Sequence, residues 1–177
     1  MNKVRVLIAA LVLFILMATA MVSLDSLIKT DVTPLGIVSF QFIATVEASV
    51  LAMDAWGDIG RSAVAISLGL DYLYIIVYSV IACLVLLLTS QSLSVQLPTF
   101  SKILFYMIYA LPIIGIADAV ENYSLIQLLL GSVNVSWPSL AYYCATIKFA
   151  GLGAVGVLVV LGYGYKMVKQ FTRLNSV

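Results

Sequence analysis

The sequence predicts an all-α integral membrane protein, a bundle of four transmembrane helices, and three observations lead to this fold class. First, 63% of the 177 residues are hydrophobic and only 10% are charged, whereas a soluble domain carries about a quarter charged and roughly half apolar residues. Second, the apolar residues gather in four runs, each long enough for the ~20-residue helix that crosses a bilayer. Third, most basic residues fall on one side of the membrane when successive runs cross it in alternating directions.

The four apolar runs define the predicted spans, and we expect them to form a single membrane domain over residues 1–177. The spans are residues 4–24, 63–89, 103–130 and 140–167. The first run also has the basic start, the apolar core and the Ala18-Thr19-Ala20 motif of a signal peptide, and we interpret it as a retained span. Pro98, in the linker after the second run, and Pro138, before the fourth, suit helix boundaries.

The distribution of charge predicts that both termini lie in the cytoplasm (N-in/C-in), because basic residues favour the cytoplasmic side of a membrane. The inner side then receives Lys3, Arg5, Lys102, Lys166, Lys169 and Arg173. The outer side receives Asp25, Asp31, Asp54 and Asp58, with only Lys29 and Arg61 as basic residues. Trp56 and Trp137 are then expected at the outer membrane interface, where tryptophan is favoured.

Residues 34–56, between the first and second spans, form a segment of a different kind. The segment is apolar enough to touch lipid but contains Gln41, Glu47 and Asp54. The two acids are seven residues apart, which places them on one face of a helix. We therefore predict an amphipathic helix on the outer side, lying on the membrane or dipping into it. An ordinary outer loop with a helix packed on the bundle is the alternative.

Polar residues interrupt the third span, where the sequence between residues 117 and 123 reads ADAVENY. Asp118, Glu121 and Asn122 are separated by three and four residues, so they share one helical face. With the predicted orientation they lie in the outer part of the span. Charged groups in a membrane span are rare and usually functional.

Two further spans carry charged residues at a similar depth. Asp71 lies in the outer half of the second span, on one stripe with Tyr74 and Tyr78, and Lys148 lies in the outer half of the fourth span. The spacing permits contact among these groups and Asp118 and Glu121 of the third span. Agreement in depth among three independent segments indicates a common polar cluster.

The energetics favour contact within this cluster. A charge at the centre of a transmembrane helix costs about 2.5–3.5 kcal/mol on insertion scales, so four charges facing lipid would cost on the order of 10 kcal/mol. Pairing with Lys148 inside the bundle avoids this cost, but three carboxylates then face one ammonium group. Two interpretations stay open: a structural network that fixes helix packing, and a site for a ligand, a proton or a reaction.

The composition excludes several classes of function. The chain has no histidine, which removes the commonest zinc ligand, the usual haem ligands and the usual general base. The net charge of +1 gives no reason to expect nucleic acid as a partner. Cys83 and Cys144 lie in apolar runs without a CxxC motif, so we expect two separate packing residues. We predict no cofactor and no metal ion.

Six pieces of sequence, spread over the chain beyond the first span, carry a resemblance. They are TPLGIVSFQF (33–42), Trp56, LDYLYIIVY (70–78), ADAVEN (117–122), WPSLA (137–141) and the Lys148-Phe149 pair. Together they resemble an uncharacterised family of small bacterial four-span membrane proteins, with the Asp-x-x-Glu-Asn pattern as the most distinctive part. The resemblance implies the fold and the bacterial cytoplasmic (inner) membrane, and it implies no activity. The family pattern often has an acid where this chain has Gln41, which argues against a charged role there.

Three hypotheses about function follow. The first is a protein that binds a lipid-like or small amphiphilic ligand, with membrane lipids as partners. Its candidate ligand-binding residues are Asp71, Asp118, Glu121, Asn122, Lys148, Tyr74, Tyr78 and Glu47. The second is an accessory or structural subunit of a larger membrane complex, or a homo-oligomer, because the glycines of residues 151–164 permit close helix contact. The third is an intramembrane enzyme that uses carboxylates, which the lack of histidine and of a recognisable nucleophile disfavours.

Overall fold

Most residues lie in helices in the computed structural model, which describes residues 3–174 and the side chains of residues 3–172. The elements are α1 (Lys3–Asp25), α2 (Ile37–Gln41), α3 (Val46–Leu93), α4 (Pro98–Met107), the 3-10 helix η1 (Ile108–Ala110), α5 (Leu111–Leu129) and α6 (Ser136–Leu174). Residues 3–174 contain no strand. The prediction of an all-α fold is confirmed. Arg173, counted among the basic residues, lies outside the described side chains.

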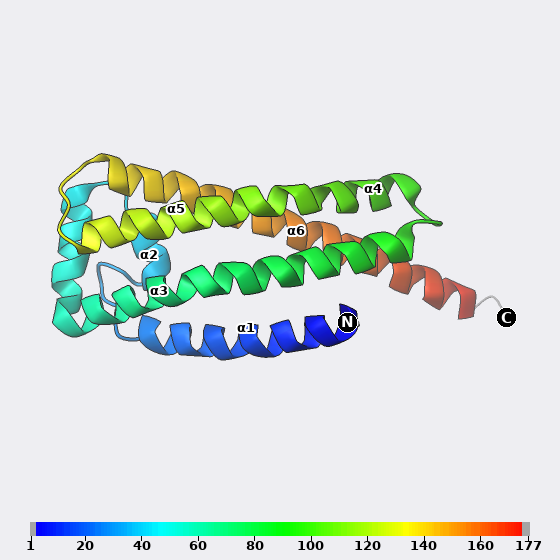
Figure 1. Ribbon diagram of the computed structural model, residues 1–177, viewed down its shortest axis with the longest axis horizontal. Coiled ribbons are helices and arrows are strands. Elements are labelled where there is room, and N and C mark those ends of the chain that lie inside the picture. Colours follow the sequence, from blue (N-terminus) through cyan, green and yellow to red (C-terminus); the bar gives the residue numbers. More distant parts are fainter. Residues whose placement is uncertain (1–2, 175–177) are drawn as a thin grey trace.

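Four helical stretches in the described part of the chain are long and apolar enough to cross a membrane: α1, α3, the α4–η1–α5 stretch and most of α6. They run side by side in alternating directions (Figure 1). The start of α1, the turn between α3 and α4, and the end of α6 lie at one end of the bundle, the terminal end (Figure 1). We call the opposite end, formed by residues 26–57 and 130–136, the capped end. The prediction of four helical stretches with the length and apolarity of membrane spans is thus confirmed for residues 3–172.

The helices extend beyond the predicted spans. The second predicted span lies inside the 48 residues of α3, and the fourth lies inside the 39 residues of α6. An apolar run shows only which part of a helix suits the hydrocarbon. The helical backbone hydrogen bonds continue beyond it into the flanking polar residues. The third span is interrupted by η1, because Pro112 has no N–H to bond the carbonyl four residues before it.

Residues 34–56 do not form the single amphipathic helix that we predicted. The segment contains the short helix α2 and the first eleven residues of α3, and residues 42–45 separate them. Thr45 interrupts the helix and starts a new one. Its backbone is extended and its hydroxyl accepts the Ala48 N–H at 3.2 Å, as an N-cap does. The start of α2 is anchored on α1, because the carboxylate of Asp25 accepts the Ile37 N–H at 2.7 Å.

Gly57 divides α3 into two parts that point in different directions. Its φ of 62° and ψ of −168° are non-helical. Residues 46–56 lie across the capped end of the bundle, and the rest of α3 runs along it (Figure 1). This backbone conformation is essentially restricted to glycine, so the change of direction depends on this residue.

Replacing Gly57 by alanine should therefore lower the free energy of unfolding by about 1–3 kcal/mol through backbone strain alone. Space does not limit the substitution, because no heavy atom outside the adjacent backbone lies within 4 Å of the position that the new Cβ would take. Gly69 is the matched control, since it is equally open but helical, and alanine there should be neutral or stabilising. Equilibrium unfolding in mixed micelles measures both variants. Equal effects of the two substitutions would contradict the role of the Gly57 backbone.

Trp56 lies inside the protein at the capped end, where protein side chains surround its ring. Its side chain is 6% exposed, and its ring packs edge-on against Phe40 of α2 at 4.8 Å. The indole N–H donates to the Thr33 hydroxyl at 2.8 Å, and that hydroxyl donates to the Ile28 carbonyl at 2.6 Å. The indole needs this partner because a buried N–H without an acceptor is costly. Trp56 therefore holds the α1–α2 connection onto α3.

Two apolar clusters hold the bundle together. The cluster at the capped end contains Ile28, Phe40, Ala52, Met53, Trp56, Val64, Leu68, Leu125, Leu128 and Ala141. The cluster in the terminal half contains Leu86, Leu93, Leu104, Leu111, Ile114 and Val155. Between them lie polar groups on α3, α5 and α6. Cys83 and Cys144 are both free, as predicted.

Candidate functional site

Lys148 of α6 forms the centre of a buried ion-pair network with α5. Its Nζ donates to Asp118 Oδ1 at 3.0 Å and to Glu121 Oε1 at 2.9 Å, and it lies 2.9 Å from Glu121 Oε2. The three side chains are 7%, 2% and 0% exposed. The three-residue spacing of the two acids places both carboxylates on the side of α5 that faces α6.

Two buried side-chain hydrogen bonds join α3 to α5 beside this ion pair. The Tyr78 hydroxyl donates to Asp118 Oδ2 at 2.9 Å, and Asn122 Nδ2 donates to Asp71 Oδ2 at 2.7 Å. We call the six residues the polar network: Asp71, Tyr78, Asp118, Glu121, Asn122 and Lys148. The structure thus brings together six of the eight residues singled out in the sequence. Tyr74 packs edge-on against Tyr78 at 6.0 Å, next to the network.

Small residues let the three helices approach closely around the network. A Cβ on Gly151 of α6 would lie 2.6 Å from the side chain of Ile114 on α5. A Cβ on Gly115 of α5 would lie 3.3 Å from Ile75 on α3. Close approach of helix backbones at such positions is a common packing mode in membranes. Here it brings the short carboxylates of Asp71 and Asp118 within reach of groups on neighbouring helices.

The network has more negative than positive groups. Asp71, Asp118 and Glu121 face a single basic residue, Lys148, and all four are buried. Lys148 is bonded to two of the acids, whereas Asp71 has no ion pair with it and accepts a hydrogen bond from the neutral amide of Asn122. Buried charges are stable when they are paired and their remaining hydrogen-bonding sites are satisfied. This network does not satisfy that condition by itself.

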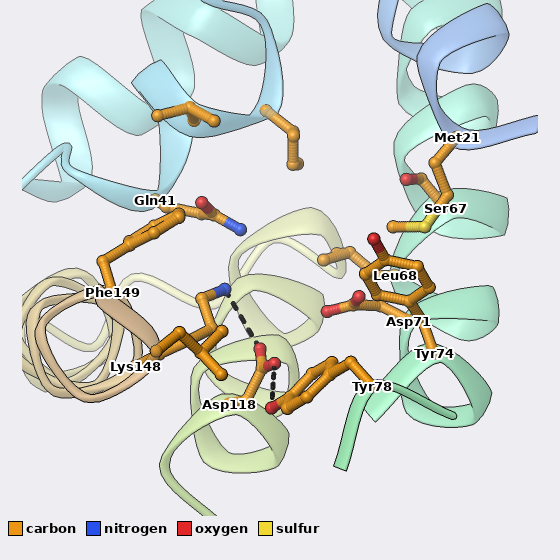
Figure 2. Close-up of a pocket in the computed structure, with 13 residues that line it drawn as sticks. Met21, Gln41, Ser67, Leu68, Asp71, Tyr74, Tyr78, Asp118, Lys148 and Phe149 are labelled. Carbon is orange, nitrogen blue, oxygen red and sulfur yellow. Dashed lines mark hydrogen bonds and ion pairs between the residues drawn. The ribbon is translucent and has the colours of Figure 1, made fainter. Parts of the chain in front are cut away.

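A pocket of about 330 Å³ borders the network. Five helices contribute to it, as Figure 2 shows in a close-up of its residues. The lining consists of Met21 from α1; Ile37, Val38 and Gln41 from α2; Ser67, Leu68, Asp71, Tyr74 and Tyr78 from α3; Asp118 from α5; and Lys148, Phe149 and Leu152 from α6. The carboxylate of Asp71 and the amine of Lys148 both point into the space between these helices (Figure 2).

Gln41 contributes a polar group that the sequence analysis did not place in the site. It is 6% exposed, and the amide end of its side chain points into the pocket (Figure 2). Its Oε1 is buried without a hydrogen-bond partner among the described residues. A buried polar group without a partner is uncommon and calls for an explanation. In the sequence, the feature that could have indicated this pocket residue is a single amide side chain within an apolar segment.

Aromatic rings form part of the walls. Tyr74 stacks on Phe14 of α1 at 4.8 Å. On the opposite wall, Phe149 stacks on Phe42 at 5.8 Å, and its ring centroid lies 4.9 Å from Lys148 Nζ. The pocket therefore combines aromatic and aliphatic walls with a few buried polar groups, which is the usual composition of a small-molecule site.

Glu47 does not belong to the site, contrary to the expectation from the sequence. It lies exposed in the first turn of α3, at the capped end, and it does not line the pocket. A negative charge in the first turn of a helix is favourable because of the helix dipole. Glu47 therefore has a local role at the start of α3. The spacing that placed it on one helical face with Asp54 did not indicate a binding site.

The side of the pocket between α1 and α6 is held together by few direct helix contacts. Both helices contribute lining residues, yet α1 packs mainly on α3 and makes few direct contacts with α6. Within Lys3–Asp25 only Met17 is buried. On this side the lining residues are Met21 of α1 and Leu152 of α6, both of them apolar.

Comparison with known proteins adds no relative to this description. No protein-family model, no curated protein and no solved structure matches the chain. The resemblance to small bacterial four-span membrane proteins therefore stays a prediction, and the function has to be inferred from the site.

Proposed function

We propose that this protein binds a lipid-like or small amphiphilic molecule whose polar group enters the pocket and contacts the polar network. The observation that carries the proposal is the pocket itself, which has apolar walls and ends at buried polar groups that are incompletely paired among the described residues. A structural network that only fixes helix packing needs no adjoining pocket, and it is most stable when its charges balance.

The route into the pocket, in this proposal, runs from the bilayer between α1 and α6. Met21 on α1 and Leu152 on α6 line the two sides of this route. Both side chains are apolar, so they suit contact with a hydrocarbon chain while the polar group lies deeper. Separation of α1 from α6 breaks few contacts, which permits entry without disruption of the buried ion pairs.

We further propose that the capped end faces outward and that the site lies in the outer half of a bacterial cytoplasmic membrane. Support comes from the basic residues at the terminal end, which include Lys3 and Arg5 of α1 and Lys102 of α4. Lys29 at the capped end and Arg61, four residues beyond it in α3, each pair with an aspartate, which reduces the net positive charge there. Basic residues favour the cytoplasmic side.

Filling the pocket should abolish binding of the amphiphile. Ser67 lines the pocket and is 5% exposed, so Ser67→Phe places a ring where the ligand would lie. Ala65, two residues earlier on α3, is exposed, and Ala65→Phe is the matched control. Native mass spectrometry of gently extracted protein should find a bound molecule on wild type and on the control, and none on Ser67→Phe.

Three results decide this experiment. A retained mass that is equal in wild type, Ala65→Phe and Ser67→Phe contradicts binding in this pocket. A wild-type chain with no retained molecule also contradicts the proposal. A stable assembly with other chains and no small molecule favours the accessory-subunit hypothesis instead. Thermal melting of each variant in the same detergent verifies that it is folded.

A further inference from the structure

We infer that the polar group of the bound amphiphile is a cationic amine with N–H donors, and that Asp71 is its counter-ion. This inference rests on the proposed function and specifies the ligand class for the same pocket. It follows from the charges around the pocket, from the position of Gln41 and from the aromatic walls.

The charges leave one carboxylate for the ligand. Lys148 is bonded to Asp118 and to Glu121, so its charge is already shared by two acids. Asp71 lies on the other side of the pocket, is 8% exposed and points into it (Figure 2). The neutral amide of Asn122 donates a hydrogen bond to it, and the carboxyl group of Asp118 lies within side-chain hydrogen-bond reach. A cation beside Asp71 would compensate this charge directly, whereas Lys148 forms its ion pairs with Asp118 and Glu121.

Gln41 gives independent evidence that a polar group is missing from the pocket. Its side chain is more than nine-tenths buried, and its amide end points into the pocket across from Asp71 (Figure 2). No residue between positions 3 and 172 provides a hydrogen-bond donor to its Oε1. In Figure 2 the Nε2 atom lies nearer the middle of the pocket, and a half-turn of the terminal amide would place Oε1 there instead. An ammonium group has three N–H donors and no acceptor, so it can bond both Asp71 and Gln41.

The walls suit the same group. The ring of Tyr74 lies on the Asp71 side of the pocket, and the ring of Phe149 lies on the Gln41 side (Figure 2). A cation near the face of an aromatic ring gains further stabilisation. Beyond these rings, Met21, Val38 and Leu152 provide apolar surface for the first methylenes of a chain.

An anionic polar group does not suit this pocket. It would approach Lys148, whose amine already has two carboxylate partners, and it would add a fourth negative charge to the three acids. A neutral polar group fits in size but leaves the Asp71 charge uncompensated. The order of affinity should therefore be amine, then alcohol, then carboxylate.

Three probes with the same chain length test this order: decylamine, decanol and decanoate. Each is added at equal concentration to purified full-length protein in a neutral maltoside detergent, and occupancy is read by native mass spectrometry. Specific binding is the occupancy of wild type minus that of Ser67→Phe. Decylamine should bind about tenfold more tightly than decanol, because only the ammonium group also compensates the charge of Asp71.

Two variants with side chains of similar size test whether Asp71 and Gln41 contact the amine. Asp71→Asn should lower the affinity for decylamine about tenfold and the affinity for decanol by a smaller factor, because asparagine still accepts a hydrogen bond but carries no charge. Gln41→Leu should also lower decylamine binding, by a smaller factor, and it tests the second contact if Asp71→Asn fails to fold. Equal loss of all three probes in both folded variants would overturn the assignment, because it indicates a change of pocket shape.

The outcomes separate the identity of the polar group from the existence of the site. Equal specific binding of decylamine and decanol overturns the amine inference and leaves amphiphile binding standing. Stronger binding of decanoate overturns the inference as well and makes Lys148 the primary contact. No specific binding of any probe to wild type overturns the proposed function itself.

Discussion

Replacement of Lys148 by methionine should lower the free energy of unfolding by about 3–5 kcal/mol, the usual cost of removing one partner from a buried ion pair. The substitution leaves Asp118 and Glu121 buried without a counter-charge, since both carboxylates are bonded to the same amine. Methionine retains the length of the side chain, so the loss reports on charge more than on packing. Equilibrium unfolding in mixed micelles of maltoside and dodecyl sulfate provides the measurement.

Two controls make the Lys148 result specific. Lys166→Met changes an exposed lysine on the same helix, and its effect should be small because exposed charges contribute little. The triple variant Lys148→Met, Asp118→Asn, Glu121→Gln removes all three charges and should recover most of the lost stability, because neutral replacement of a buried ion pair is often tolerated. If Lys148→Met is as mild as Lys166→Met, the ion pairs do not hold α5 against α6.

Trp56→Ala should cost about 3–5 kcal/mol, as truncation of a large buried aromatic side chain does. The variant loses the edge contact with Phe40 and the hydrogen bond to Thr33. Because these contacts hold the α1–α2 connection, α2 should also become mobile. Gln41 and Val38 on α2 line the pocket, so ligand retention should fall together with stability. Unfolding and native mass spectrometry on the same preparation test both effects.

Two comparisons show which part of Trp56 matters. Trp56→Phe keeps most of the ring and loses the indole N–H, so it should cost about 1 kcal/mol. Ile59→Ala removes a side chain that is 74% exposed at the same end of the protein, and it should have little effect on packing. If Trp56→Ala and Ile59→Ala have equal effects, the capped end is not held by Trp56.

The four spans were predictable because each follows from a local property, the apolarity of about 20 consecutive residues. The burial of Trp56 was not, because its partner Thr33 is 23 residues away in the sequence. Composition alone places a tryptophan near an interface, and only the fold of residues 26–45 determines whether lipid or protein covers it. The break at Thr45 has a local cause, an N-cap, which the amphipathic pattern of residues 34–56 concealed.

The polar network was predictable in its members but not in its pairing. Helical depth and spacing indicated Asp71, Asp118, Glu121 and Lys148, because rotation and depth of a helix follow from residue number. Which acid bonds Lys148 depends on the distances between helices, which the sequence does not give. Gln41 was missed for a related reason: its position in the pocket depends on the way in which α2 folds back over α3 and α6.

The sequence separation of the Lys148 ion pairs has a consequence for biosynthesis. The amine follows Asp118 by 30 residues and Glu121 by 27, so at roughly 5–20 residues per second it leaves the ribosome about 1–6 seconds after them. During this interval α5 carries two carboxylates without their counter-ion, each costing about 2.5–3.5 kcal/mol in the hydrocarbon. The translocon should therefore release α5 into the lipid only together with α6, as a preformed hairpin.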